Sequence, residues 1–352
     1  MTSHPLLGVF LHMVGGLAAG SFYVPYRGVR KWVWETYWLA GGVFSWLIVP
    51  WVVALLVTPD LFSLFREAWQ KHPGDMIWCY VFGVMWGIGG LTFGLSMRYL
   101  GMSLGYAIAL GYCAAFGTLM PPIFAGTFGD VLTTQAGLVT LLGVAVCLGG
   151  IAVTGMAGMS KERELSDEQK KAAIEEFSFL KGILVATFSG ILSAGMAYGL
   201  NSGEALGRLA IGHGTPDLFW KLPVLIVVLA GGFTSNFLWC AYLSLANRTW
   251  ANYVDTRTPL LRNYLLCALA GTTWYMQFFF YQMGEARIGP YKFSSWSLHM
   301  ASIIIFSTLW GIGLQEWRGA SRRTITRLAA GLAVLVASLA IIGYGNFLKP
   351  PE

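Results

Sequence analysis

Residues 135–156, QAGLVTLLGVAVCLGGIAVTGM, contain no charged side chain, and the next charged residue is Lys161. The hydrocarbon core of a bilayer is about 30 Å thick, which an α-helix crosses with about 20 apolar residues. The stretch therefore predicts a helix that crosses a membrane. Nine more runs of this kind occur along the chain, so the sequence predicts ten such helices. The ten runs lie near residues 6–26, 36–57, 76–97, 102–125, 135–156, 182–201, 218–245, 260–284, 292–314 and 325–347.

The composition of the 352 residues excludes a water-soluble protein of two or three domains. Apolar residues make up 56% of the chain and charged residues 11%, whereas a soluble domain has about 25% charged residues. The 44 Gly suit close helix packing, and the 15 Trp and 15 Tyr suit membrane interfaces. The five Cys all lie in apolar stretches without a CxxC motif, so we interpret them as buried hydrophobic residues. The predicted fold class is an all-α integral membrane protein.

The formal charge of +6 indicates topology rather than nucleic-acid binding. The loops after spans 1, 3, 5, 7 and 9 hold 16 Lys and Arg residues, and the other side holds 7. Because Lys and Arg are enriched in cytoplasmic loops, both termini are predicted to be periplasmic. Within the basic set we expect Arg30 or Lys31 to pair with Glu35.

Ten spans divide into two halves of five, and an odd number of spans inverts the second half relative to the first. AGSFY at residues 19–23 corresponds to AGMAY at residues 194–198, although chance similarity between Gly-rich helices is an alternative. We interpret residues 1–158 and 182–352 as two inverted five-helix repeats, joined by a polar cytoplasmic linker at residues 159–181. Inverted repeats with a site between them at mid-membrane are a recurrent transporter architecture.

Span 8 carries Trp274, Gln277, Tyr281 and Glu285 at spacings of three, four and four, which places them on one helical face. Polar groups within a span are costly unless they pair or line a polar path, so they are candidates for a functional site. An indole, an amide and a phenol suit an uncharged, hydroxylated ligand such as a sugar. The alternative is an interfacial aromatic belt with Glu285 paired to Arg287, although Gln277 lies too deep for a belt.

Three further residues are candidates for substrate binding. Asn201 closes the sixth span beside the repeated motif, and Trp296 lies within the ninth span. Trp86 precedes a glycine by fifteen residues, as Trp274 does in the other half, so it is the repeat counterpart of Trp274. We expect these side chains to face the stripe on span 8.

Three residues are candidates for carrying a proton. His12 and His299 lie within spans, and an imidazole changes charge near neutral pH. Glu285 lies at the predicted membrane edge, where water reduces the cost of its charge. We therefore rank His12 first, His299 second and Glu285 third. The alternative is that both histidines are hydrogen-bonded packing residues.

Several classes of enzyme and pump are excluded by missing motifs. The chain contains no DxxxD, no HExxH and no P-loop, so prenyl transfer, zinc proteolysis and ATP-driven pumping lack their usual residues. A secondary transporter is the class that remains. Such a protein is not an enzyme, and we expect no metal and no cofactor other than the proton as coupling ion.

Long strings with rare residues in fixed order make a family recognisable. They include FYVPYRGVRKWVWETYW at residues 22–38, MWGIGGLTFGLSMRYLGMSLG at 85–105 and WYMQFFFYQMGEARI at 274–288. With these strings the chain resembles the L-rhamnose–proton symporter family of the drug/metabolite transporter superfamily. The resemblance implies ten helices in two inverted repeats and proton-coupled uptake of L-rhamnose or a related 6-deoxy sugar. One position departs from the family pattern, since Glu285 stands where the family string carries His.

The resemblance also implies partners and a location. The expected partners are a small sugar, protons and the lipid bilayer of the bacterial inner membrane, without nucleic acid, and the chain is expected to be a monomer or homodimer. Two alternatives stay open. One is an exporter of small metabolites from the same superfamily, and the other is a membrane sugar receptor that does not transport.

Overall fold

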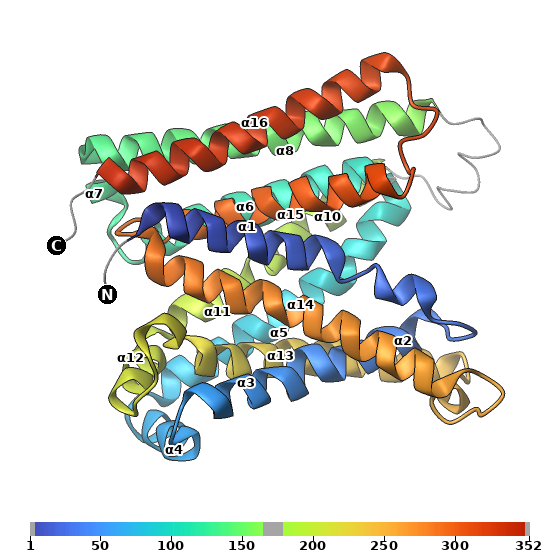
Figure 1. Ribbon diagram of the computed structural model, residues 1–352, viewed down its shortest axis with the longest axis horizontal. Helices are drawn as coiled ribbons and strands as arrows, with labels where there is room; N and C mark the ends of the chain where they lie inside the picture. Colours follow the sequence, from blue (N-terminus) through green and yellow to red (C-terminus); the bar gives the residue numbers. More distant parts are fainter. Residues whose placement is uncertain (1–3, 101, 165–178, 349–352) are drawn as a thin grey trace.

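The computed structural model of the protein describes residues 4–100, 102–164 and 179–348, and for residues 97, 98, 100, 102–107 and 179 it describes the backbone alone. The described residues form helices and connecting loops, without a β-strand among them. The long helices lie side by side and run roughly along the long axis of the molecule (Figure 1). The described chain begins and ends at the same end of this bundle.

The long helices are α1 (Pro5–Ser21), α5 (Pro73–Leu100), α6 (Met102–Phe124), α8 (Gln135–Arg163), α10 (Phe179–Ser193), α13 (Leu222–Ala246), α14 (Leu260–Ile288), α15 (Ser294–Gly313) and α16 (Arg322–Leu348). The short elements are η1 (Pro25–Gly28), α2 (Trp34–Gly42), η2 (Val43–Ile48), α3 (Val49–Val57), α4 (Leu61–Lys71), α7 (Phe128–Thr133), α11 (Gly195–Ser202), α12 (Glu204–Gly212), η3 (Asp217–Phe219) and η4 (Trp250–Tyr253). Two sets of consecutive helices follow one another almost without interruption. α2, η2 and α3 follow without a loop, with η2 as a π-helical turn, and α10 is separated from α11 by one residue.

Eight segments of the described chain are long and apolar enough to cross a membrane. Two of the ten predicted spans are not among them. Only Ile108–Phe124 of α6 lies among the residues whose side chains are described, and α14 is made less apolar by residues such as Gln277, Gln282 and Glu285. The protein is therefore an all-helical, multi-pass membrane protein, with eight spans supported by length and composition.

Glycine and proline determine how the helices begin and end. Pro5 and Pro223 lie in the first turns of α1 and α13, where the missing N–H would have had no helical partner. Gly289 ends α14 with φ 115° and ψ −153°, a conformation that is essentially confined to glycine. This turn allows the chain to reverse, so that α15 returns through the bundle and contacts α14.

α1 lies very close to α14 and α15 because glycines form its contact face. A Cβ at Gly8 would lie 2.8 Å from the Ile288 Cα, and a Cβ at Gly15 would lie 2.8 Å from the Gln277 carbonyl oxygen. Such distances are too short for any side chain larger than hydrogen. The close approach brings His12 of α1 against both neighbouring helices.

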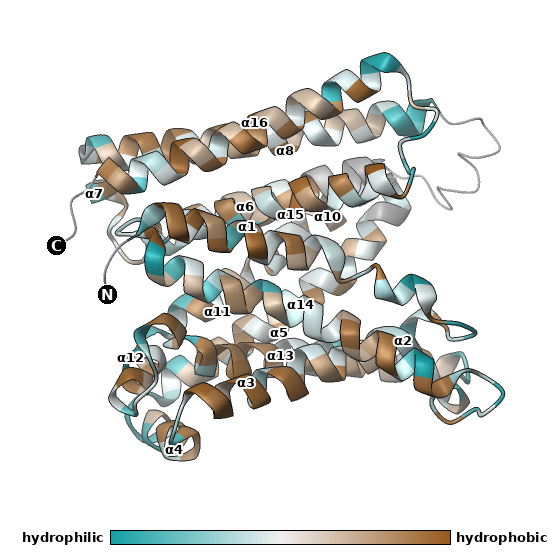
Figure 2. Cartoon of the chain, in the orientation of Figure 1, coloured by the Kyte–Doolittle hydropathy of each residue, from teal (hydrophilic) through white to brown (hydrophobic). Residues whose placement is uncertain are grey.

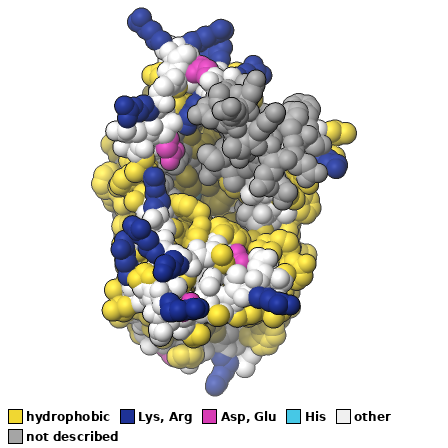
Figure 3. Space-filling view, turned by 90° about the vertical axis from the view of Figure 1, so that its right-hand side faces the viewer, with side chains coloured by type: hydrophobic (Ala, Val, Ile, Leu, Met, Phe, Trp, Pro, Cys, Tyr) yellow, Lys and Arg dark blue, Asp and Glu magenta, His cyan; other side chains and the backbone are white. Residues whose placement is uncertain are grey.

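Hydrophobic residues dominate the middle of the bundle, and hydrophilic residues gather towards its two ends (Figure 2). The end opposite the termini carries η1, η4 and the beginning of α16 (Figure 1). Figure 3 views this end and shows Lys and Arg side chains spread over it. The five cysteines are buried and free, which confirms the prediction for them.

Candidate functional site

The stripe predicted on α14 lies in the interior of the bundle. Trp274, Gln277, Tyr281 and Glu285 have exposed fractions of 9%, 5%, 5% and 7%. An interfacial belt would direct its aromatic rings outward to the lipid headgroups. The belt is therefore the wrong interpretation of these residues, which face other helices instead.

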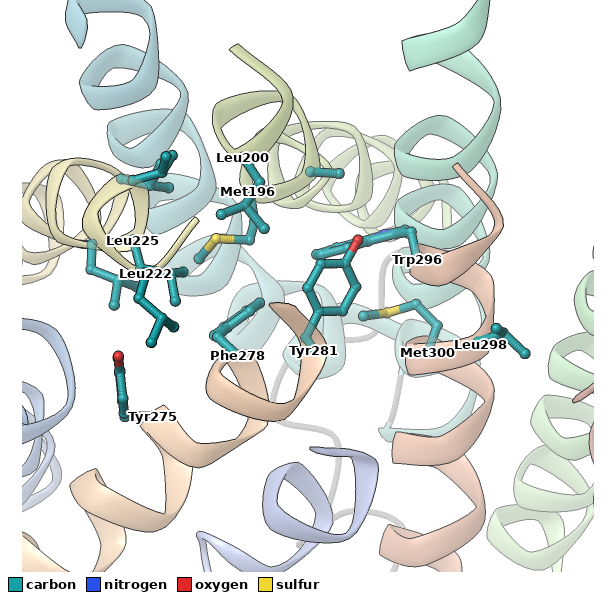
Figure 4. Close-up of a cluster of buried hydrophobic side chains, with 14 of the residues drawn as sticks. Met196, Leu200, Leu222, Leu225, Tyr275, Phe278, Tyr281, Trp296, Leu298 and Met300 are labelled. Atoms are coloured by element: carbon teal, nitrogen blue, oxygen red, sulfur yellow. The ribbon is translucent and has the colours of Figure 1, made fainter. Parts of the chain in front are cut away.

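α1 and α15 add two histidines and an indole to the stripe. The ring centroid of Tyr281 lies 5.1 Å from that of His12, 5.2 Å from that of His299 and 5.8 Å from that of Trp296. The two imidazole centroids are 6.5 Å apart. Figure 4 shows Tyr281 beside Trp296, on the far side of Phe278 from Tyr275. We call His12, Tyr281, Trp296 and His299 the two-histidine cluster.

The histidines of this cluster have no hydrogen-bond partner in the described part of the chain. Both rings are fully buried, and neither Nδ1 nor Nε2 of either ring is bonded. The Trp296 Nε1–H, in contrast, donates to the Cys113 carbonyl oxygen at 3.1 Å, which fixes the indole. Buried polar atoms nearly always have a partner, so these four nitrogens are unusual among the buried polar atoms of the described residues. They can bind a proton, water or a hydroxylated ligand.

A second group of aromatic residues contacts α14 at Trp274, about two helical turns before Tyr281. Trp46 of η2 contacts Trp38, Trp86 and Trp274 at centroid distances of 5.9, 6.1 and 5.8 Å, and Trp86 lies 5.5 Å from Trp274. We call these four residues the tryptophan cluster. Trp86 and Trp274 were predicted from the sequence, whereas Trp38 and Trp46 were not, although Trp46 lies four residues after a Gly-Gly pair within an apolar span.

A cavity of about 10 Å³ borders the tryptophan cluster, which is the space of about one water molecule. Its lining residues are Phe22, Tyr26, Trp38, Gly42, Ser45, Trp46 and Trp274. A sugar occupies many times this volume. The indoles are therefore packed against one another here, and a sugar could enter only if they separated.

Phe278 joins the two clusters into one aromatic layer. Its ring centroid lies 5.2 Å from that of Trp274 and 6.3 Å from that of Tyr281. The layer draws on both halves of the chain, because His12, Trp46 and Trp86 come from the first half and the α14 and α15 residues from the second. Such a layer places stacking surfaces and polar atoms between the two halves.

Glu285 forms a buried ion pair that the sequence analysis did not predict. The Lys221 Nζ donates to Glu285 Oε1 at 2.7 Å, and the two side chains are 3% and 10% exposed. The Lys221 ammonium also lies 4.9 Å from the ring centroid of Trp220. We had expected water at the membrane edge to reduce the cost of the Glu285 charge. The buried Lys221 ammonium pairs with this charge instead. Glu285 lies one helical turn from Tyr281, so the ion pair borders the two-histidine cluster.

Two other predictions concern Asn201 and Glu35. Asn201 is exposed on α11, whereas the residues of the stripe are buried. The expected pairing of Glu35 with Arg30 or Lys31 is wrong. The Glu35 carboxylate instead accepts hydrogen bonds from the Asn247 amide at 3.0 Å and the Thr249 hydroxyl at 3.1 Å.

Comparisons with known proteins agree with the sequence resemblance. Residues 1–347 match the model of a family described as L-rhamnose-proton symport protein. A protein of Citrobacter koseri named L-rhamnose-proton symporter is 38% identical, over 98% of this chain and 99% of that protein. A protein of Salmonella gallinarum with the same name is 39% identical over the same shares. One solved crystal structure shares the fold, with a TM-score of 0.56, 14% identity and coverage of 98% of this chain and 99% of that chain.

Proposed function

The chain belongs to the L-rhamnose–proton symporter family, and on this premise we propose that it imports L-rhamnose or a related 6-deoxy sugar together with protons. The family consists of transporters rather than enzymes. Transport would proceed by alternating access across the bacterial inner membrane, with the proton as coupling ion. The observation that carries the proposal is the buried α14 stripe, which lies beside two histidines that have no hydrogen-bond partner among the described residues. Stacking rings, hydroxyl-binding groups and a titratable site are thereby brought together.

Uptake into vesicles tests this function. Purified protein in sealed vesicles should accumulate labelled L-rhamnose above the external concentration when the outside is made acidic, and a protonophore should abolish the accumulation. A receptor would bind the sugar without accumulating it, and an exporter of other metabolites would leave L-rhamnose untransported. Either result would contradict the proposal.

For the architecture we propose ten spans in two inverted repeats, residues 1–158 and 182–352. The largest helix contacts support it, because they are preserved when α1 is exchanged with α10, α2 with α13, α5 with α14, α6 with α15 and α8 with α16. α1 packs on α14 and α15 as α10 packs on α5 and α6, and α2 packs on α14 as α13 packs on α5. α8 contacts α16, and α2 contacts α13; exchanging the two halves leaves each of these two contacts unchanged. Most of the proposed linker, residues 159–181, lies outside the described residues.

The proposed topology places both termini in the periplasm and the linker in the cytoplasm. In intact cells with a permeabilised outer membrane, Ser3→Cys should react with a membrane-impermeant maleimide, whereas Ser166→Cys should react only after lysis. Both positions lie outside the described residues. The native cysteines are all buried, so their background labelling should be low. Labelling of Ser166→Cys alone in intact cells would reverse the topology.

We assign sugar contacts to Trp274, Gln277, Tyr281, Trp86 and Trp296, the predicted residues that lie in the aromatic layer or beside it. Indole faces suit the C–H surface of a sugar ring, and the amide and phenol suit its hydroxyls. A neutral hydrogen bond contributes about 0.5–1.5 kcal/mol net. Affinity would then depend on several such contacts together with stacking.

Gln277→Ala should weaken L-rhamnose binding about tenfold, because a sugar hydroxyl buried against the stripe would lose its partner. Calorimetric titration of the purified variant measures this change. Gln70→Ala provides a matched control, since Gln70 is exposed on α4 and should have no effect on binding. Unchanged affinity in Gln277→Ala would place the site elsewhere.

We assign the coupling proton to His12 first, with His299 second and Glu285 third. The two imidazoles are close enough that two positive charges would repel strongly in an apolar environment, so the pair would hold at most one proton. Tyr281 contacts both rings and belongs to the proposed sugar site. Protonation of the pair could therefore alter the position of a sugar-binding side chain.

A further inference from the structure

We infer that Trp46 selects the sugar, binding the apolar edge of a 6-deoxy hexose with its indole face and one sugar hydroxyl with its Nε1–H. The inference rests on the proposed function and extends it. Trp46 was not among the residues that the sequence suggested. Three independent features of its surroundings lead to this assignment.

The first feature is the orientation of the indole rings around Trp46. Its ring lies nearly perpendicular to those of Trp274 and Trp86, at interplanar angles of 90° and 82°. Three indoles in this arrangement form walls of different orientation around one point. A C–H face and a methyl group can contact all three walls without leaving a polar atom unpaired.

The second feature is the indole N–H of Trp46. The side chain is only 3% exposed, yet Nε1 has no acceptor in the described part of the chain. The N–H of neighbouring Trp38, by comparison, donates to Asn236 Oδ1 at 3.0 Å. Buried indole N–H groups usually have a partner. A hydroxyl of a bound sugar would supply the missing acceptor beside the stripe.

The third feature is the backbone that carries Trp46. The side chain projects from the π-helical turn η2, which precedes Pro50 and interrupts one long helix. Single π-helical turns occur frequently at functional sites and can relax to α-helix with a change of register. Because the bordering cavity holds only about 10 Å³, the indoles must separate to admit a sugar. η2 is the element that can move Trp46 away from Trp274 and Trp86.

This geometry specifies which sugars should bind well. A 6-deoxy hexose carries a methyl group at C6, whereas its 6-hydroxy counterpart carries an additional hydroxyl there. Within a wall of indole carbons that hydroxyl would lose its water without gaining an acceptor. Apolar pockets reject an added hydroxyl by up to about a hundredfold. We therefore expect L-rhamnose to bind about tenfold to a hundredfold more tightly than L-mannose, its 6-hydroxy counterpart.

The test compares calorimetric titrations of both sugars into the full-length protein and two variants. Trp46→Phe keeps an aromatic face but removes the N–H, so both affinities should fall about tenfold while the preference for L-rhamnose persists. Trp46→Ala removes the wall, so the preference should shrink to about threefold or less. Trp239→Phe is the matched control, because Trp239 is 45% exposed on α13 and should leave both affinities unchanged.

The outcomes separate this inference from the proposed function. If the parent protein binds neither sugar, the proposed function fails. If the parent binds L-rhamnose but shows no preference over L-mannose, or if Trp46→Phe binds both sugars as the parent does, the role of Trp46 is overturned. Thermal unfolding of Trp46→Phe provides the check on folding, since this substitution retains most of the buried ring. A folded Trp46→Phe protein with weakened affinity for both sugars supports the inference even if Trp46→Ala fails to fold.

Discussion

Replacing His12 by Gln should abolish proton-driven accumulation of L-rhamnose while sugar binding and sugar exchange persist. Gln is similar to His in size and can donate and accept hydrogen bonds, but it does not take up a proton near neutral pH. His12 is fully buried, makes no hydrogen bond within the described chain, and contacts Tyr281 of the proposed sugar site. The loss should therefore affect proton binding more than packing.

Two transport assays on the same vesicles distinguish these effects. Uptake under an imposed pH gradient measures coupling, and counterflow exchange without a gradient measures sugar movement alone. His213→Gln is the matched control, because His213 contacts Glu67 at 2.7 Å near the end of α12 and is remote from the stripe. Undiminished concentrative uptake by His12→Gln would remove His12 from the mechanism and shift the assignment to His299.

The parts of the site that sequence predicted are those that follow helical spacing. Trp274, Gln277, Tyr281 and Glu285 share one face because α14 is continuous through all four positions. His12 and His299 were found because an ionisable residue in an apolar span is rare. Composition and spacing could thus identify the buried stripe and its titratable neighbours without any knowledge of helix packing.

The parts that sequence missed depend on breaks in helical spacing. Trp46 lies within the π-helical turn η2, where α-helical spacing no longer predicts the direction of a side chain. Asn201 was chosen for its place after the AGMAY motif, which begins at Ala194, the break between α10 and α11, and the structure leaves it exposed. Neither interruption could be read from the apolar composition of these spans.

The Lys221–Glu285 pair was missed for a different reason, because it joins residues that are far apart along the chain. Lys221 immediately precedes the apolar run of α13 and has the sequence pattern of a loop residue. Its burial follows from the packing of the N-terminus of α13 beside α14, with Trp220 over the ammonium. Only the tertiary arrangement brings the two charges together.

Lys221→Met should lower the stability of the folded protein by about 3–5 kcal/mol, because it leaves the Glu285 carboxylate buried without its partner. Adding Glu285→Gln should recover most of this loss, since the double variant buries no unpaired charge. Thermal unfolding of the purified protein measures both changes. Arg208→Met is the matched control, because Arg208 pairs with Glu204 at the surface and is 74% exposed, so its loss should cost about 1 kcal/mol or less.

The same double variant decides whether Glu285 carries the coupling proton. If His12 and His299 hold the proton, the folded Lys221→Met/Glu285→Gln protein should still accumulate L-rhamnose under a pH gradient, because neither imidazole has been changed. Accumulation that is lost while counterflow exchange persists would instead identify Glu285 as the proton carrier and overturn our ranking. A single variant could not distinguish these cases, because an unpaired buried charge would impair folding and transport together. The restored stability of the double variant separates the contribution of the ion pair to stability from any role in coupling.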